Sequence, residues 1–233
     1  MKVAGGRLYL TVVGLHLASL FAGGWAVAGT KLLIVPVLAW VVWREAERLP
    51  RCYAGALVAS WVGDLAMWVA DDGLVLGAGG WLTAGIGAFG VAHVCYAWLA
   101  VRAGGRLPPK LVTTATATVA VGAGILLRLP QLMVLYALTL LLLVYLAGTL
   151  ARKPVAGAAG IEVGAFGDAG AGVGYRLVFA GALAFAASDA LIAWQLAGGW
   201  MGTRPWGTVV IMALYTGGQW GLRGLAHPRH PAP

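Results

Sequence analysis

Residues 59–96 read ASWVGDLAMWVADDGLVLGAGGWLTAGIGAFGVAHVCY, two apolar segments joined by a short acidic, glycine-rich turn. Asp64 lies in the middle of the first segment, and His93 and Tyr96 lie in the second. Segments of this kind are long enough to cross a membrane. A carboxylate inside a membrane-spanning helix costs about 3 kcal/mol on insertion scales, so it indicates a functional site by default. What Asp64 faces therefore decides what the protein can do.

The composition is that of an integral membrane protein with almost no extramembrane domain. The 233 residues are 61% hydrophobic and 10% charged, and the mean hydropathy is +0.85. A soluble domain carries about 25% charged residues. The formal net charge of +8 does not indicate a nucleic-acid partner, because Lys and Arg lie between hydrophobic runs rather than in one patch. Cys52 and Cys95 have neither metal-binding nor disulfide spacing.

Eight segments are long and apolar enough to cross a bilayer, which takes about 20 residues each. We therefore predict an all-α, polytopic membrane helix bundle with eight transmembrane helices in a single domain, residues 1–233. The predicted spans are residues 8–28, 30–44, 52–70, 81–101, 110–127, 130–150, 173–197 and 205–225.

The distribution of positive charge predicts the orientation. With eight spans, both termini and the loops after the second, fourth and sixth spans share one side. The Lys and Arg residues on that side are Lys2, Arg7, Arg44, Arg48, Arg51, Arg102, Arg106, Lys110, Arg152, Lys153, Arg176, Arg223 and Arg229. The opposite side has only Arg128 and Arg204. By the positive-inside rule both termini are cytoplasmic, and we expect a bacterial cytoplasmic membrane.

Three ionisable residues fall at one depth in the predicted bundle. At ~1.5 Å of rise per residue, Lys31, Asp64 and Asp189 each lie ~20 Å from the arginine at the cytoplasmic end of their own helix. We therefore expect the two carboxylates to meet across an internal cavity, with the lysine near them. In the alternative interpretation, Lys31 lies at a helix end and its ammonium group reaches out to the membrane interface.

Further polar residues recur at helical spacing nearer the cytoplasm. Phe89, His93 and Tyr96 share one face of the fourth predicted span, and Tyr215 and Gln219 share a face of the last. Lipid cannot satisfy polar groups, so these faces should point into the bundle. Together with the residues at the level of Asp64 they predict a polar column.

Paired buried carboxylates suit one type of reaction. Two carboxyl groups that share a buried site rarely both stay ionised, so one can act as an acid and the other as a base. The protonated group can donate a proton to an acetal-like or enol-ether substrate, and the other can activate water against the oxocarbenium-like species that develops. This chemistry needs no metal, and we predict no metal and no cofactor.

Other interpretations of the same residues remain open. Asp64 and Asp189 can be structural, by hydrogen bonding across helices or by pairing with Lys31. They can also form a proton or ion relay in a small lipid or proton-coupled transporter. His93 can be a packing residue, and the protein can be a binding or scaffold protein.

Two weaker patterns concern helix packing. Gly63-Asp64 and Ser188-Asp189 each put a small residue before a carboxylate within a span, which hints at a repeat of four plus four helices, residues 1–127 and 128–233. Gly217 and Gly221 form a GxxxG pattern, which is typical of close helix packing.

Five short motifs in order make the chain resemble a known family. They are T-K-x-x-x-x-P from Thr30, G-D at Asp64, G-x-G-A-F-x-x-x-H-x-x-Y ending at Tyr96, F-x-x-S-D ending at Asp189 and Y-x-x-x-Q ending at Gln219. This order resembles the YhhN family, which includes the animal lysoplasmalogenases. Leu32 stands where the family pattern has a proline.

The resemblance implies an activity and a site. The family consists of multi-pass membrane proteins, with members that cleave the vinyl ether of lysoplasmalogens to a fatty aldehyde and a glycerophospho-alcohol. It implies that Asp64 and Asp189 are the catalytic acid and base, and that the partners are a lysophospholipid substrate and membrane lipids. The residues implied to line the substrate pocket are Lys31, His93, Tyr96, Ser188, Tyr215 and Gln219.

Overall fold

The structure is a computed structural model that describes residues 2–46, 49–71, 78–107, 131–152, 171–196 and 205–226. These residues form helices, and no strand occurs among them. The helices are α1 (Lys2–Ala22), α2 (Trp25–Glu45), α3 (Arg51–Asp71), α4 (Ala78–Arg102), α6 (Gln131–Ala151), α7 (Ala171–Leu196) and α8 (Trp206–Leu222), followed by the short 3-10 helix η1 (Arg223–Ala226). The all-α prediction is confirmed for this part of the chain. The predicted span 110–127 lies outside it.

Six of the helices, α1 to α4, α6 and α7, are long and apolar enough to cross a membrane. α8 is shorter, at 17 residues. A helix satisfies its backbone hydrogen bonds internally, which is the condition for crossing the hydrocarbon region. The structure therefore describes a polytopic helical membrane protein.

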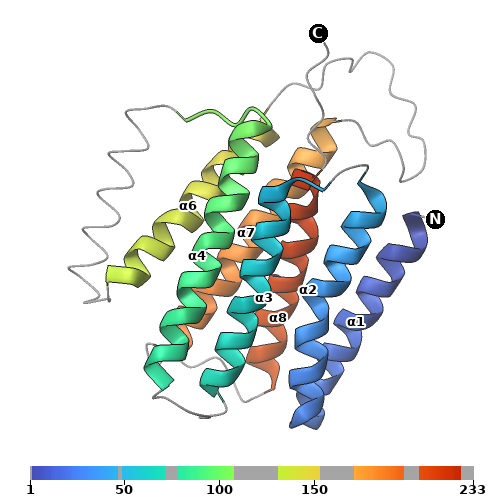
Figure 1. Cartoon of the computed structure of the whole chain (residues 1–233), viewed down its shortest axis with the longest axis vertical. Coiled ribbons are helices and arrows are strands. Elements are labelled where there is room, and N and C mark those ends of the chain that lie inside the picture. Colours follow the sequence, from blue (N-terminus) through green and yellow to red (C-terminus); the bar gives the residue numbers. More distant parts are fainter. Residues whose placement is uncertain are drawn as a thin grey trace.

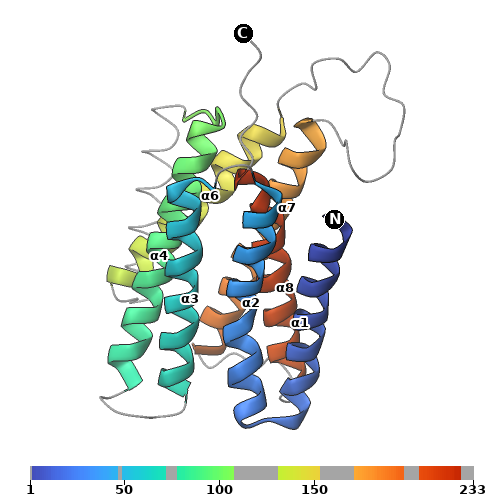
Figure 2. The same ribbon diagram turned by 45° about the vertical axis from the view of Figure 1, so that its right-hand side comes forward.

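The helices form a closed circuit (Figures 1 and 2). Each described helix packs against the next in the chain, and α8 packs back against α1. Figure 2 shows α1 to α4 side by side in front, with α6, α7 and α8 behind them. Side chains from α3, α4, α7 and α8 consequently meet in the interior of the bundle.

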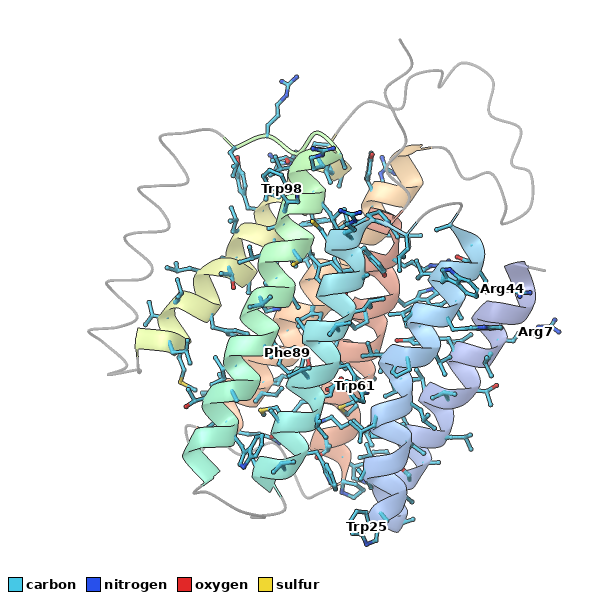
Figure 3. The ribbon with its side chains drawn as sticks, in the orientation of Figure 1. Arg7, Trp25, Arg44, Trp61, Phe89 and Trp98 are labelled. Atoms are coloured by element: carbon cyan, nitrogen blue, oxygen red, sulfur yellow. The ribbon has the colours of Figure 1, made fainter. Side chains whose placement is uncertain are left out.

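The apolar core of the bundle contains a small set of buried polar residues, and its outside is also apolar. Asp64, His93, Ser188 and Gln219 are among the buried polar residues. Many large apolar side chains are instead exposed, such as Trp25, and Figure 3 shows Trp25 and Trp98 at the periphery. This distribution fits a membrane, because lipid accepts apolar side chains and polar ones must find partners in the protein.

The first predicted boundary is wrong by several residues. The sequence suggested a break near residue 29, but α1 ends at Ala22 and α2 begins at Trp25. Gly23 and Gly24 have φ angles of 73° and 63°, a left-handed conformation that glycine adopts without steric cost and that commonly ends a helix. Lys31 is therefore in the second turn of α2 rather than at its outer end.

Glycines bring α7 and α8 into backbone contact. A Cβ atom on Gly221 would lie 2.6 Å from the Cα of Gly181, and one on Gly218 would lie 2.9 Å from the backbone nitrogen of Phe185. Nothing lies within 4 Å of a Cβ on Gly217. The GxxxG pattern was therefore half right: Gly221 packs against α7, but its partner on α8 is Gly218, not Gly217.

This contact predicts opposite effects for two neighbouring substitutions. We expect Gly221→Ala to lower the free energy of unfolding by about 1–3 kcal/mol, because the added methyl group forces the two helices apart. Gly217→Ala should be neutral or stabilising by up to about 1 kcal/mol, because alanine favours the helix and the site is open. Thermal unfolding in detergent measures both, and equal effects of the two changes would contradict the packing.

Candidate functional site

Asp64 is the centre of one buried cluster. The residue lies within α3 and is only 3% exposed. The hydroxyl group of Tyr215, from α8, donates a hydrogen bond of 2.6 Å to Asp64 Oδ2. Lys31 Nζ, from α2, lies 3.9 Å from Asp64 Oδ1. One carboxylate oxygen thus has a hydrogen-bond donor and the other faces a cation.

The position of Lys31 follows from the packing of α2 on α3. Trp61 Nε1 donates a 3.0 Å hydrogen bond to the carbonyl oxygen of Leu32, next to the lysine. The Lys31 side chain is 17% exposed, so most of it lies inside the bundle. A carboxylate in a membrane interior is expensive unless its charge is compensated, and this ammonium group compensates it. Of the two interpretations of Lys31, the structure supports the one that turns it toward Asp64.

Asp189 is the centre of a second cluster. The residue belongs to α7, and its side chain is 12% exposed. The hydroxyl group of Tyr136, from α6, donates a 2.6 Å hydrogen bond to Asp189 Oδ2, and His93 Nε2, from α4, lies 3.9 Å from the same oxygen. The two carboxylates therefore have similar neighbours: a phenol at hydrogen-bonding distance and a side-chain nitrogen somewhat farther away.

The imidazole of His93 is held from several sides. Its ring lies 4.9 Å from the ring of Tyr136, and Thr139 Oγ1 lies 3.5 Å from Nδ1. The residue is fully buried, and Nε2 has no hydrogen-bond partner among the residues that the structure describes. A buried polar atom normally has such a partner. His93 Nε2 is thus free to accept or donate a hydrogen bond beside Asp189.

Tyr96 and Gln219 form a network toward the C-terminal ends of α4 and α8. Tyr96 donates a 2.8 Å hydrogen bond to Gln219 Oε1, and Gln219 Nε2 donates one of 3.1 Å to Ser60 Oγ. Gln219 Nε2 also lies 3.5 Å from the hydroxyl oxygen of Tyr215. These groups join α3, α4 and α8, and all of them are buried. Their hydrogen bonds position Tyr215 against Asp64.

Ser188 has a separate hydrogen bond. Its hydroxyl group donates to the backbone oxygen of Ile211 at 3.1 Å, which ties α7 to α8. Gly63 has a comparable packing role, because a Cβ atom there would lie 2.7 Å from the ring of Phe89. The small residue before each carboxylate thus permits close packing of its helix.

Aromatic rings connect the two clusters. The ring of Phe185 lies 5.4 Å from that of Tyr215, which bonds to Asp64, and 5.1 Å from that of His93, which faces Asp189. Phe89 lies 6.0 Å from Tyr215 and 6.4 Å from Phe185. Within the described part of the chain, no hydrogen bond or ion pair joins the two carboxylates. Among the described residues, aromatic contacts occupy this part of the bundle.

Tyr136 is the residue at this site that sequence reasoning missed. It stands in an otherwise aliphatic stretch, LMVLYALTLLLL, so no motif marked it. The signal that was available is its spacing from Thr139, because residues three apart share a helix face. Thr139 Oγ1 indeed donates to the backbone oxygen of Tyr136 at 2.8 Å and faces His93.

The groups available for chemistry are carboxyl, imidazole, ammonium and phenol side chains. Within the described ranges, no three His, Cys, Asp or Glu side chains gather where they could hold a metal ion. These ionisable groups lie inside a bundle that includes six helices long and apolar enough to cross a membrane. The chain is therefore an integral membrane protein with ionisable groups in its interior.

The comparison with protein families identifies the chain more closely. The YhhN family model matches residues 26–225, which is most of the sequence. The chain belongs to the YhhN family, and the resemblance seen in the five motifs is confirmed. No curated protein and no solved structure matches it.

Proposed function

We propose that the chain is a membrane hydrolase that cleaves the vinyl ether bond of a lysoplasmalogen to a fatty aldehyde and a glycerophospho-alcohol. Membership of the YhhN family, which includes the animal lysoplasmalogenases, is compatible with this activity. The observation that carries the proposal is the pair of carboxylates inside the bundle. Each accepts a 2.6 Å hydrogen bond from a tyrosine and has a side-chain nitrogen 3.9 Å away, from Lys31 or from His93.

The first step needs a proton donor, and we assign it to Asp189. The neighbours of Asp189 are a phenol and an imidazole, whereas an ammonium group faces Asp64. A cation close to a carboxyl group favours its ionised form, so the group without one is the better acid. Protonated Asp189 transfers its proton to the alkenyl carbon that is not bonded to oxygen. The vinyl ether becomes an oxocarbenium ion, and Asp189 becomes a carboxylate.

The second step adds water, and we assign its activation to Asp64. Its carboxylate, with charge compensated by Lys31, accepts a proton as water bonds to the oxocarbenium carbon. The product is a hemiacetal, whose carbon–oxygen bond to glycerol then breaks. Asp64 gives its proton to the glycerol oxygen, and Asp189 accepts the proton of the hemiacetal hydroxyl group, whose oxygen becomes that of the aldehyde. One water is consumed, and both carboxyl groups regain their starting states.

The proposal places the substrate beside the aromatic contacts between the clusters. Phe185 touches both Tyr215 and His93, so an enol ether that reaches both carboxyl groups lies near this ring. His93 Nε2 lacks a hydrogen-bond partner among the described residues and is available to the ether or glycerol oxygen. In this proposal Lys31 and Tyr215 hold Asp64, while Tyr96, Gln219 and Ser188 support the pocket.

The proposal includes eight crossings in one domain, with both termini in the cytoplasm of a bacterial cell. In Figure 1, α4 ends at the same end of the bundle as α2 and α8, while α6 begins well below that end. An additional crossing between α4 and α6, at 110–127, is consistent with this. Figure 3 shows Arg7 and Arg44 toward the same end, as the positive-inside rule requires of a cytoplasmic face.

A contact exchange supports the four-plus-four repeat within that domain. Asp64 of α3 is contacted by Tyr215 of α8, and Asp189 of α7 is contacted by His93 of α4. The carboxylate of each proposed half is therefore contacted by a side chain from the last helix of the other half: α8 for Asp64 and α4 for Asp189.

Aldehyde detection with the purified protein tests the proposed activity. We expect release of fatty aldehyde from lysoplasmenyl-ethanolamine, and none from the ester or saturated ether lysolipids of the same chain length, because only the vinyl ether yields a stabilised cation on protonation. Proteoliposomes provide the comparison with the alternative function. Uptake of lipid or protons without product would favour a transporter and contradict the hydrolase.

A further inference from the structure

A groove is lined by residues of α4 and α6. These two helices lie toward the left of the bundle in Figure 1. The volume of the groove is about 330 Å³, at the lower end of the range of about 300–1,000 Å³ that is usual for small-molecule sites. Its walls are mostly aliphatic side chains and glycines of the two helices, and its lining is almost entirely apolar. Val91 and Leu135 on these walls are 56% and 58% exposed, so the groove opens sideways rather than toward an end of the bundle.

The groove reaches the Asp189 cluster. Tyr136 and Thr139 belong to its lining, and the Tyr136 hydroxyl group donates to Asp189 at 2.6 Å. Thr139 faces the imidazole of His93, whose Nε2 is buried without a hydrogen-bond partner in the described part of the chain. An apolar path from the outside of the bundle therefore ends at polar groups suited to a single oxygen-containing function.

Glycines keep the groove open. A Cβ atom on Gly87 would meet nothing within 4 Å, and one on Gly90 would touch only the Tyr136 ring, at 3.8 Å. Gly85, on the same helix, is different, because its Cβ would lie 3.1 Å from Met67 of α3. On α4, one glycine thus serves helix packing, and two others leave space along the groove.

We propose that this groove, called here the α4/α6 groove, binds the hydrocarbon chain of the lysolipid and admits it sideways from the membrane. The proposal rests on the proposed function and adds the entry route of the substrate and the binding site of its hydrocarbon chain. Aliphatic walls favour a hydrocarbon over any polar occupant. A chain held there leads to the Tyr136–Asp189–His93 cluster, where its enol ether meets the proton donor.

Photochemical labelling tests the groove without depending on catalysis. The probe is a saturated ether lysolipid, which has no vinyl ether to cleave, with a diazirine within its alkyl chain. We expect labelled peptides from α4 and α6 in the wild-type protein. Gly87→Leu should reduce this labelling about tenfold, equivalent to about 1.4 kcal/mol of binding, because the new side chain occupies the groove.

Gly14→Leu is the matched control. Gly14 is also in an apolar helix and has nothing within 4 Å of a Cβ, but it lies on α1. The control should label as the wild type does. Where Gly87→Leu does not fold, Val91→Trp on the exposed wall is expected to give the same loss.

The outcomes separate this proposal from the proposed function. Labelling that depends on Gly87, in a protein that releases no aldehyde, would support the groove and contradict the hydrolase. Labelling on other helices, or labelling unchanged in a folded Gly87→Leu protein, would overturn the groove. A wild-type protein without label on α4 and α6, combined with a lower unfolding temperature of Gly87→Leu, would show that the chain itself fills the groove and would also overturn it.

Discussion

Asp189→Asn is expected to slow aldehyde release from lysoplasmenyl-ethanolamine by about 10²–10⁴-fold, the usual contribution of a general acid. The amide has nearly the same shape and can still accept the hydrogen bond from Tyr136, so the fold should be retained. It cannot, however, give a proton to the alkenyl carbon. Initial rates at saturating substrate measure the effect, with the unfolding temperature in detergent as the check on folding.

Glu45→Gln is the control for this change. Glu45 is also a carboxylate within a helix, but it pairs with Arg223 at 3.1 Å and belongs to neither cluster. The same carboxylate-to-amide change there should leave the rate unaltered. If Asp189→Asn is folded and as active as Glu45→Gln, Asp189 is not the acid.

Asp64→Asn is expected to reduce the rate by a similar factor, about 10²–10⁴-fold, because the base that activates water is lost. It also leaves Lys31 without its partner inside the bundle. Lys31→Met leaves the Asp64 carboxylate uncompensated in the same way. Removing one member of a buried ion pair costs more than removing both. We therefore expect the double variant to unfold at a higher temperature than the sum of the single effects predicts.

A double-mutant cycle measures this coupling. The expected coupling free energy of unfolding is about 1–3 kcal/mol, as for residues in direct contact. Activity should be lost in all three variants. If the effects of the two single substitutions on the free energy of unfolding simply add in the double variant, Lys31 and Asp64 do not interact. If the double variant is active, their charges play no part in the reaction.

The shared level of Lys31 and Asp64 could be predicted from the sequence. Counting residues from Arg44 and Arg51, near the ends of α2 and α3 predicted to be cytoplasmic, put them at one level, and the structure has them 3.9 Å apart. The rise along a helix is nearly constant, so counting residues is enough to give the position along each helix. The shared face of Phe89, His93 and Tyr96 is also found inside the bundle, where all three contact residues of other helices.

The rotation of each helix and its partners could not be predicted in the same way. Spacing did not reveal that Phe185 would stand between Tyr215 and His93, because that depends on how four helices pack. The same limit applies to α8, where the packed glycines are Gly218 and Gly221. Sequence periodicity defines a face, but tertiary contacts decide what it meets.

The isotopic fate of the substrate tests the central claim most directly. The purified protein is incubated with lysoplasmenyl-ethanolamine in D₂O and, separately, in H₂¹⁸O, and the masses of the products are measured by mass spectrometry. Proton transfer to carbon predicts one deuterium on the aldehyde carbon next to the carbonyl and a glycerophospho-alcohol without ¹⁸O. An aldehyde without carbon-bound deuterium, ¹⁸O in the glycerol product, or no aldehyde at all would contradict carboxyl-catalysed hydrolysis of the vinyl ether.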